Sequence, residues 1–75
     1  MRRAISINKL RTYLPVYRTE RNMKQEELAA LVNVRRETIS RLEKGLYNPY
    51  LKLAMDISKV FNMPVEKLFE FYEGE

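Results

Sequence analysis

Apolar residues recur along this chain at the three- and four-residue spacing of amphipathic helices. Between residues 25 and 32, for example, Leu28, Ala29 and Val32 fall on one helical face. The breaks between such stretches fall at Asn, Gly and Pro, which favour helix ends and turns. We therefore expect five helices, at about residues 14–21, 25–32, 36–44, 50–61 and 64–68.

Individual residues between these stretches predict where the helices end. Asn33 and Asn62 tolerate the left-handed backbone conformation that a sharp turn needs. Gly45 follows a lysine at a position typical of a helix C-terminus. Beyond the last helix, residues 69–72 alternate apolar and polar, as a short strand would. Residues 4–7 fit a strand, a loose arm or a packed extension, and the pattern does not choose between them.

The composition fits one globular domain, with 75 residues of which 45% are apolar. The chain contains no cysteine and no histidine, which excludes disulfides, zinc fingers, thiol nucleophiles and the commonest general base. Because the carboxylates are scattered over the expected helix surfaces, we expect no enzyme activity, no metal and no cofactor. The apolar stretches run only a few residues, so we expect no membrane span and a cytoplasmic protein.

Charge is distributed unevenly along the chain, whose formal net charge is +4. Residues 1–50 hold eleven basic and five acidic residues, whereas residues 51–75 hold three basic and five acidic residues. The excess of positive charge in residues 1–50 favours a polyanionic partner such as nucleic acid. The alternative is a soluble protein with ordinary surface lysines and arginines.

The expected helices at 25–32 and 36–44 flank a tight turn at Asn33 and Val34, which is the arrangement of a helix-turn-helix. In such a unit the second helix must protrude far enough to enter a DNA major groove about 12 Å wide, while the first helix braces it. The inward positions are accordingly small or apolar, and a large side chain at Ala29 would push the two helices apart.

Four ordered motifs extend this match to a known family. They are the segments at residues 25–29, 34–40, 42–45 and 48–49. Through them, about residues 14–69 of the chain resemble the phage repressor/Cro-like (XRE) helix-turn-helix family. The resemblance implies a mainly α, compact five-helix, lambda-repressor-like domain that binds double-stranded DNA, usually as a homodimer on a near-palindromic operator.

Within this family the chain is most similar to small repressors that carry a strand after the fifth helix. In that subfamily a strand before the first helix pairs with the strand after the last, which here would join residues 11–13 to residues 69–72 in a small antiparallel ribbon. The chain would then divide into an N-terminal extension at 1–13, the DNA-binding domain at 14–69 and a C-terminal strand with an acidic tail at 70–75.

The chain departs from the family at the helix starts, where family members usually carry a Ser or Thr N-cap. Each missing cap costs on the order of 1 kcal/mol when nothing replaces it. Asn48, which precedes Pro49, is a candidate substitute cap for the fourth helix. The four N-cap positions here hold Lys24, Arg35, Tyr50 and Pro64.

Three residues on the exposed face of the third helix match base-reading positions of the family, namely Arg36, Glu37 and Arg41. Arginine most often donates two hydrogen bonds to guanine O6 and N7, and glutamate can accept one from cytosine N4. Glu37 requires such a donor, because DNA phosphates repel a carboxylate. The alternative is a solvated charged face with an i,i+4 pair between Glu37 and Arg41.

Backbone phosphates are the expected partners of the residues around the third helix. Gln25 opens the second helix, where its side chain and backbone N–H can meet a phosphate at the positive end of the helix dipole. The alternative for Gln25 is an ordinary surface position, whereas the residues that flank the third helix would, taken one at a time, fit a plain surface position equally well. The other expected backbone contacts are Lys24, Arg35, Ser40, Lys44, Tyr47 and Asn48.

Arg18 and Glu43 stand at positions where family members often pair an arginine of the first helix with a glutamate near the end of the third. We expect a partly buried structural ion pair there, not an active site. Removing one partner would strand a charge, so the loss should affect folding more than DNA contact.

An apolar cluster near the C-terminus is the expected homodimer interface. A two-fold axis there would present two recognition helices about one helical turn (~34 Å) apart. The alternative is that the cluster covers the core of its own chain. Its members are Met63, Val65, Leu68, Phe69 and Phe71.

Together these features predict a sequence-specific transcriptional regulator, in particular a repressor that occludes a promoter. Since 75 residues leave no room for an effector domain, no small-molecule ligand is expected. The alternative is an antitoxin-like or adaptor protein that uses the same fold to bind another protein, because a fold alone does not determine function. Arg2, Arg3 and Lys9 fit either a contact with DNA or a free N-terminal arm.

Overall fold

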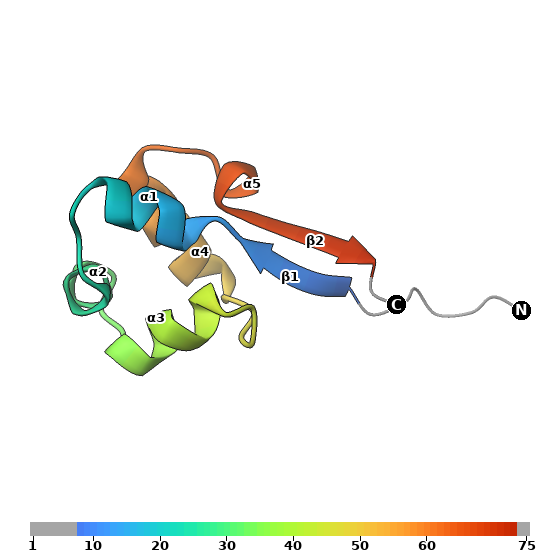
Figure 1. The fold of residues 1–75 in the computed structure, drawn as a ribbon, viewed down its shortest axis with the longest axis horizontal. Helices are drawn as coiled ribbons and strands as arrows, with labels where there is room; N and C mark the ends of the chain where they lie inside the picture. Colours follow the sequence, from blue (N-terminus) through green and yellow to red (C-terminus); the bar gives the residue numbers. More distant parts are fainter. Residues whose placement is uncertain (1–7, 74–75) are drawn as a thin grey trace, which may run out of the picture.

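A computed structural model describes residues 8–73 of the chain as a group of short helices from which a two-stranded ribbon projects (Figure 1). The five expected helices are confirmed within these residues, and each end lies within one residue of its expected position. The elements in chain order are β1 (Asn8–Thr12), α1 (Leu14–Glu20), α2 (Gln25–Leu31), α3 (Arg36–Glu43), α4 (Leu51–Phe61), α5 (Val65–Leu68) and β2 (Phe69–Glu73).

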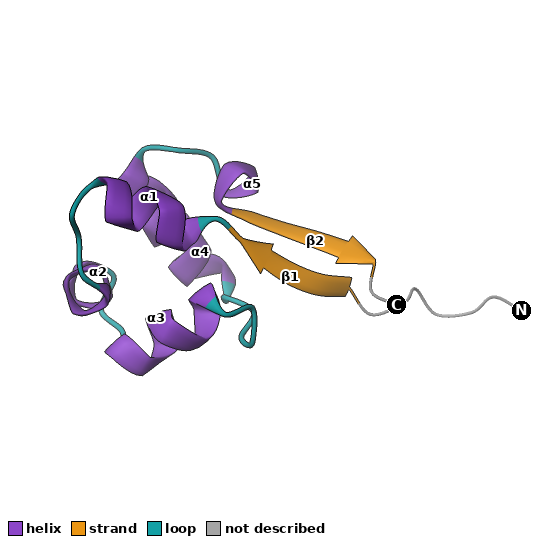
Figure 2. Ribbon diagram, viewed as in Figure 1, coloured by secondary structure: helices purple, strands orange, loops and turns teal. Residues whose placement is uncertain are grey.

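The ribbon pairs the segment before the helices with the segment after them (Figure 2). Its strands run antiparallel, from Thr12 opposite Phe69 to Asn8 opposite Glu73. Residues opposite each other lie on the same face of a ribbon, and the faces alternate along each strand. The face that carries Leu10 and Phe69 contributes both side chains to the core, so the base of the ribbon is packed against the helices.

The expected ribbon between residues 11–13 and 69–72 is confirmed, with a difference in its first strand. β1 begins at residue 8 and ends before Tyr13, whose carbonyl accepts hydrogen bonds at 3.1 and 3.3 Å from backbone N–H groups in the first turn of α1. The C-terminal strand begins at residue 69. Residues 4–7, for which three conformations were open, lie outside the described residues.

Each of the four longer helices ends in the same hydrogen-bonded turn. After α2, the N–H of Val34 donates to the carbonyl of Ala29 at 2.9 Å, and the N–H of Asn33 donates to that of Ala30 at 3.3 Å. This Schellman arrangement requires a residue with positive φ directly after the helix. The expected helix-ending roles of Asn33, Gly45 and Asn62 are confirmed, and a fourth such residue lies after α1. The φ angles are 55° at Asn22, 61° at Asn33, 76° at Gly45 and 55° at Asn62.

The N-cap residues of α2 to α5 form no side-chain cap hydrogen bond, as their residue types led us to expect. In α2 the carboxylate of Glu27 accepts a hydrogen bond from the backbone N–H of Lys24 at 2.6 Å, which replaces part of a cap. The substitute cap expected from Asn48 is wrong. α4 begins at Leu51 with Tyr50 as its N-cap residue, so Asn48 lies two residues before the position from which a side chain reaches the first-turn N–H groups.

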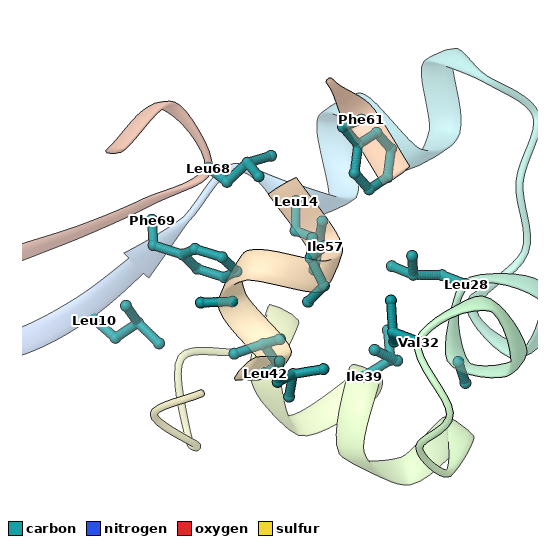
Figure 3. Packing of buried hydrophobic residues seen from close by; sticks show 13 residues of the cluster. Leu10, Leu14, Leu28, Val32, Ile39, Leu42, Ile57, Phe61, Leu68 and Phe69 are labelled. Carbon is teal, nitrogen blue, oxygen red and sulfur yellow. The ribbon is translucent and has the colours of Figure 1, made fainter. Parts of the chain in front are cut away.

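The core lies where the helices and the base of the ribbon meet (Figure 3). It consists entirely of apolar side chains, and residues 8–73 contain no buried side-chain nitrogen or oxygen that lacks a hydrogen-bond partner. The buried set is Leu10, Leu14, Leu28, Ala29, Val32, Ile39, Leu42, Leu53, Ala54, Ile57, Phe61, Leu68 and Phe69.

Candidate nucleic-acid interface

Helix α3 is held against α2 by the apolar side of the helix-turn-helix (Figure 3). Ile39 and Leu42 of α3 are fully buried, in the same core as Leu28 of α2 and Val32 directly after α2. Ala29 is only 3% exposed, so its expected inward position is confirmed, and a larger side chain there has no space. The apolar side of α3 is therefore used for folding, which leaves the opposite side free for a partner.

The outward side of α3 is a charged surface. Arg36, Glu37 and Arg41 are all exposed, and so is Lys44 directly after the helix. At about 100° per residue, these four positions fall within an arc of roughly 140° on one side of the helix. The ion pairs formed among residues 8–73 do not join Glu37 to Arg41, so both charges are presented separately to solvent. Such a surface suits a partner that offers hydrogen-bond acceptors and negative charge.

Behind this surface, Arg18 of α1 and Glu43 of α3 form an ion pair with two direct contacts. The Arg18 Nε lies 2.6 Å from Glu43 Oε2, and its Nη2 donates to Oε1 at 3.1 Å. The third guanidinium nitrogen, Nη1, donates to the carbonyl of Met23 at 2.8 Å. The two side chains are only 13% and 6% exposed. The pair therefore joins α1 to the end of α3 from the inside and has little surface to offer a ligand.

Gln25 is held by this ion pair instead of extending freely toward solvent. Its Nε2 donates to Glu43 Oε1 at 2.9 Å, and its Oε1 accepts from Arg36 Nη1 at 3.5 Å. The side chain is half-buried, so the expected phosphate contact is left mainly to the backbone N–H groups at the start of α2. Sequence reasoning did not find this connection, because the bonded residues are 18 and 11 positions apart and no periodic pattern relates them.

The other residues expected at the DNA backbone lie around the ends of α2 and α3. Lys24 and Arg35 are exposed at the N-cap positions of α2 and α3, and Asn48 is exposed in the turn between α3 and α4. Ser40 is half-buried on α3, and Tyr47 is half-buried because its ring packs against the core. The structure thus gathers most of these residues along the border of the charged surface of α3.

The expected dimer interface requires a correction. Leu68 is fully buried and Phe69 is 7% exposed, so both belong to the core of their own chain and have no surface for a second copy. The chain folds back at this point, and the Leu68 carbonyl accepts a hydrogen bond from the N–H of Tyr13 at 2.9 Å. Met63 and Val65 are half-buried against the same core, whereas Phe71 is 52% exposed.

Two cations outside α3 have shifted pKa values, and both shifts come from neighbouring side chains. Hydrogen bonding with Tyr13 raises the pKa of Arg11, and the charge of Glu70 adds to the effect. A hydrogen bond to Asp56 at 2.7 Å raises the pKa of Lys52. Among residues 8–73 there is no group of three side chains that could hold a metal ion, and no helix has the length and apolar character to cross a membrane.

Comparison with known proteins places this geometry in a family. A helix-turn-helix family model matches residues 17–68. An uncharacterised HTH-type transcriptional regulator of Archaeoglobus fulgidus is 56% identical over 66 residues, which cover 88% of this chain and 93% of the relative. A second one, from Methanocaldococcus jannaschii, is 41% identical over 66 residues, covering 88% of this chain and all of the relative.

A solved structure has the same fold. The crystal structure of the transcriptional regulator VanUg matches with a TM-score of 0.76 at 22% identity, over 97% of this chain and 100% of VanUg. The family match over residues 17–68 includes α3, whose outer side is charged and whose inner side is apolar, as in a helix-turn-helix. This chain belongs to the XRE-like helix-turn-helix family of DNA-binding transcriptional regulators.

Proposed function

We propose that this protein regulates transcription by inserting α3 into the major groove of double-stranded DNA. The observation that carries this proposal is the division of α3 into two sides. Ile39 and Leu42 are fully buried on one side, and Arg36, Glu37 and Arg41 are exposed on the other. An α-helix fits the major groove, where each base pair presents a distinct pattern of donors and acceptors.

In this proposal the two arginines read bases and the glutamate adds selectivity. Arg36 and Arg41 would donate to guanine O6 and N7, and Glu37 would accept from cytosine N4. The Arg36 guanidinium lies beside Gln25, whose Oε1 accepts a long hydrogen bond from Nη1 at 3.5 Å.

The residues that border α3 would hold the DNA backbone. Lys24 and Arg35 precede the helices of the unit, Lys44 and Asn48 follow α3, and all four are exposed. Together with the half-buried Ser40 and Tyr47 and the N–H groups at the start of α2, they would fix the register without reading sequence. This arrangement predicts binding that weakens with salt, by a log–log slope of about 0.9 for each phosphate neutralised.

The proposal includes a homodimer that occupies two half-sites about one helical turn (~34 Å) apart. Because Leu68 and Phe69 are buried, Phe71 is the exposed apolar residue of the expected interface, with Met63 and Val65 partly accessible beside the core. Sedimentation at micromolar concentration should show a species of twice 9.0 kDa, and a species of 9.0 kDa alone would contradict the dimer.

A dimer of this size bound across a promoter would block polymerase, so we propose that the protein represses the promoters it covers. A reporter gene tests this directly. Expression should fall when the selected site overlaps the promoter, and an increase would contradict repression.

The recognition role of α3 is tested by selecting bound duplexes from a random pool. Wild-type protein should yield a defined site, and Arg36→Ala should relax the preference at one base step per half-site, by about 1–3 kcal/mol. Lys67→Ala is the matched control, because Lys67 is an exposed cation of α5. Figure 1 shows α5 and α3 on opposite sides of the group of helices. An unchanged preference in Arg36→Ala would contradict base reading by this residue. Salt-insensitive binding to a protein chain, with no duplex binding, would favour the adaptor function instead.

A further inference from the structure

A basic hollow of about 440 Å³ lies where the ribbon meets the turn after α3. The ribbon contributes Lys9 from β1 and Tyr72 from β2, while the turn contributes Lys44, Gly45 and Asn48. The hollow thus joins two segments that are far apart in the sequence. The family model matches residues 17–68, which include the turn but neither strand.

Close backbone packing holds the two walls of this hollow together. Gly45 has a φ of 76°, and a Cβ atom added to it would lie 2.6 Å from the carbonyl oxygen of Leu10 in β1. Only a residue without a side chain allows the turn and the strand to approach so closely. Lys9 of β1 and Lys44 both line the hollow beside this contact.

The charges around the hollow favour an anion. Lys9 and Lys44 are exposed, neither takes part in an ion pair formed among residues 8–73, and no carboxylate lines the hollow. The carboxylate of Glu70 on the adjoining ribbon is occupied, since it lies 3.7 Å from Arg11 Nη1 and accepts a hydrogen bond from the Tyr13 hydroxyl at 2.7 Å. The carboxylate of Glu70 is thus engaged by its own partners.

The carbonyl groups at the end of α3 repel an anion less than the free carbonyl groups of an uncapped helix would. A helix C-terminus carries partial negative charge on its free carbonyl groups. Here the last turn is closed, because the N–H of Leu46 donates to the Arg41 carbonyl at 2.9 Å and the N–H of Gly45 donates to the Leu42 carbonyl at 3.0 Å. The carbonyl groups at the end of α3 therefore offset less of the positive charge that Lys9 and Lys44 bring to the hollow.

Lys44 also connects the hollow to the surface proposed to face DNA. It lies within the same arc of about 140° as Arg36 and Arg41 at the helical repeat of α3. A duplex that places α3 in its major groove therefore passes Lys44 as the backbone crosses the end of the helix. A phosphodiester offers the hollow one negative charge and acceptor oxygens for an ammonium, an amide or a phenol.

We propose that this hollow binds one phosphodiester of the DNA strand that borders the groove occupied by α3. Lys9 and Lys44 supply the charge, while the Asn48 amide and the Tyr72 hydroxyl donate hydrogen bonds. The proposal rests on the DNA-binding function proposed above and adds to it a second contact region, the β1–β2 ribbon. The ribbon positions the protein on DNA without reading sequence, as phosphate contacts do.

The test compares Lys9→Ala with wild type on the selected duplex, using fluorescence anisotropy over a series of salt concentrations. Lys9→Ala should weaken binding by about threefold, reduce the log–log salt slope by about 1 and leave the sequence preference unchanged. Lys67→Ala again serves as the control for loss of one surface charge, and thermal unfolding confirms that both variants fold. If wild type binds the duplex with the expected salt dependence but Lys9→Ala binds it as Lys67→Ala does, the phosphate site in the hollow is overturned. The proposed DNA-binding function is then unaffected.

A scan of the duplex with single neutral methylphosphonate linkages identifies the phosphate. One linkage per half-site, beside the groove that α3 occupies, should weaken wild type and should weaken Lys9→Ala by less, because Lys44 alone then supplies charge to that phosphate. Equal losses in both proteins at every linkage would overturn the assignment. Saturable binding of inorganic phosphate that depends on Lys9 and competes with no DNA linkage would assign the hollow to a free anion instead. Wild-type protein that binds no duplex overturns both this proposal and the proposed function.

Discussion

Replacing Glu43 by alanine should destabilise the fold far more than any substitution on the outer side of α3. In the wild type its carboxylate accepts two hydrogen bonds from Arg18, at 2.6 and 3.1 Å, and one from Gln25 at 2.9 Å. Glu43→Ala leaves the Arg18 guanidinium, which is 13% exposed, without its counter-charge. Breaking a buried pair in this way costs about 3–5 kcal/mol.

This loss is a large part of the free energy of unfolding of the whole chain. A chain of this length is stable by roughly 4–11 kcal/mol. For a domain of this size, a loss of about 3–5 kcal/mol lowers the melting temperature by about 12–40 °C. Differential scanning calorimetry or thermal circular dichroism measures the shift. Glu37→Ala is the matched control, because Glu37 is exposed on the same helix and its loss should change stability by less than about 0.5 kcal/mol.

A double variant keeps the experiment informative if Glu43→Ala unfolds. Arg18→Met combined with Glu43→Leu removes both charges and fills the space with apolar atoms, so it should be more stable than Glu43→Ala. The reasoning would be refuted if Glu43→Ala melted within a few degrees of Glu37→Ala and yet lost DNA binding. That result would place Glu43 in the DNA contact and not in the fold.

Three further substitutions test how the helices end and pack. Asn33→Ala should cost about 1–2 kcal/mol, because Asn33 has a φ of 61°, whereas Asn33→Gly should cost nothing; equal losses in urea unfolding would contradict the left-handed turn. Gly45→Ala should destabilise the chain and weaken DNA binding, since its Cβ would lie 2.6 Å from the Leu10 carbonyl oxygen; unchanged unfolding would show that the strand and the turn separate freely. Ala29→Leu should cost about 1–3 kcal/mol by overpacking the space between α2 and α3, and a neutral result would mean that this space is not filled.

Local signals made the helices predictable from the sequence. Helix ends depend on one or two residues, so Asn33, Gly45 and Asn62 were sufficient to predict where three of the helices stop. The start of β1 was harder to predict, because strand pairing depends on a partner at the other end of the chain. The cap expected from Asn48 failed because an error of one or two residues in a helix start moves a side chain out of capping reach.

Side chains on the outer face of α3 were predictable in position, since helical periodicity alone determines which residues share a face. Contacts across the fold were not predictable in the same way. The bond from Gln25 to Glu43 and the burial of Leu68 and Phe69 depend on how separate segments fold against one another. The hollow at Lys9 is a further case, because it requires the ribbon to pack against the turn after α3.

Methylation interference on the selected duplex tests the central claim most directly, because it reports which groove the protein occupies. Dimethyl sulfate modifies guanine N7 in the major groove and adenine N3 in the minor groove. If α3 enters the major groove, N7 methylation of a guanine in each half-site should block binding of wild type, and Arg36→Ala or Arg41→Ala should lose sensitivity at one guanine each. Interference confined to adenine N3, with every guanine N7 tolerated, would contradict the account.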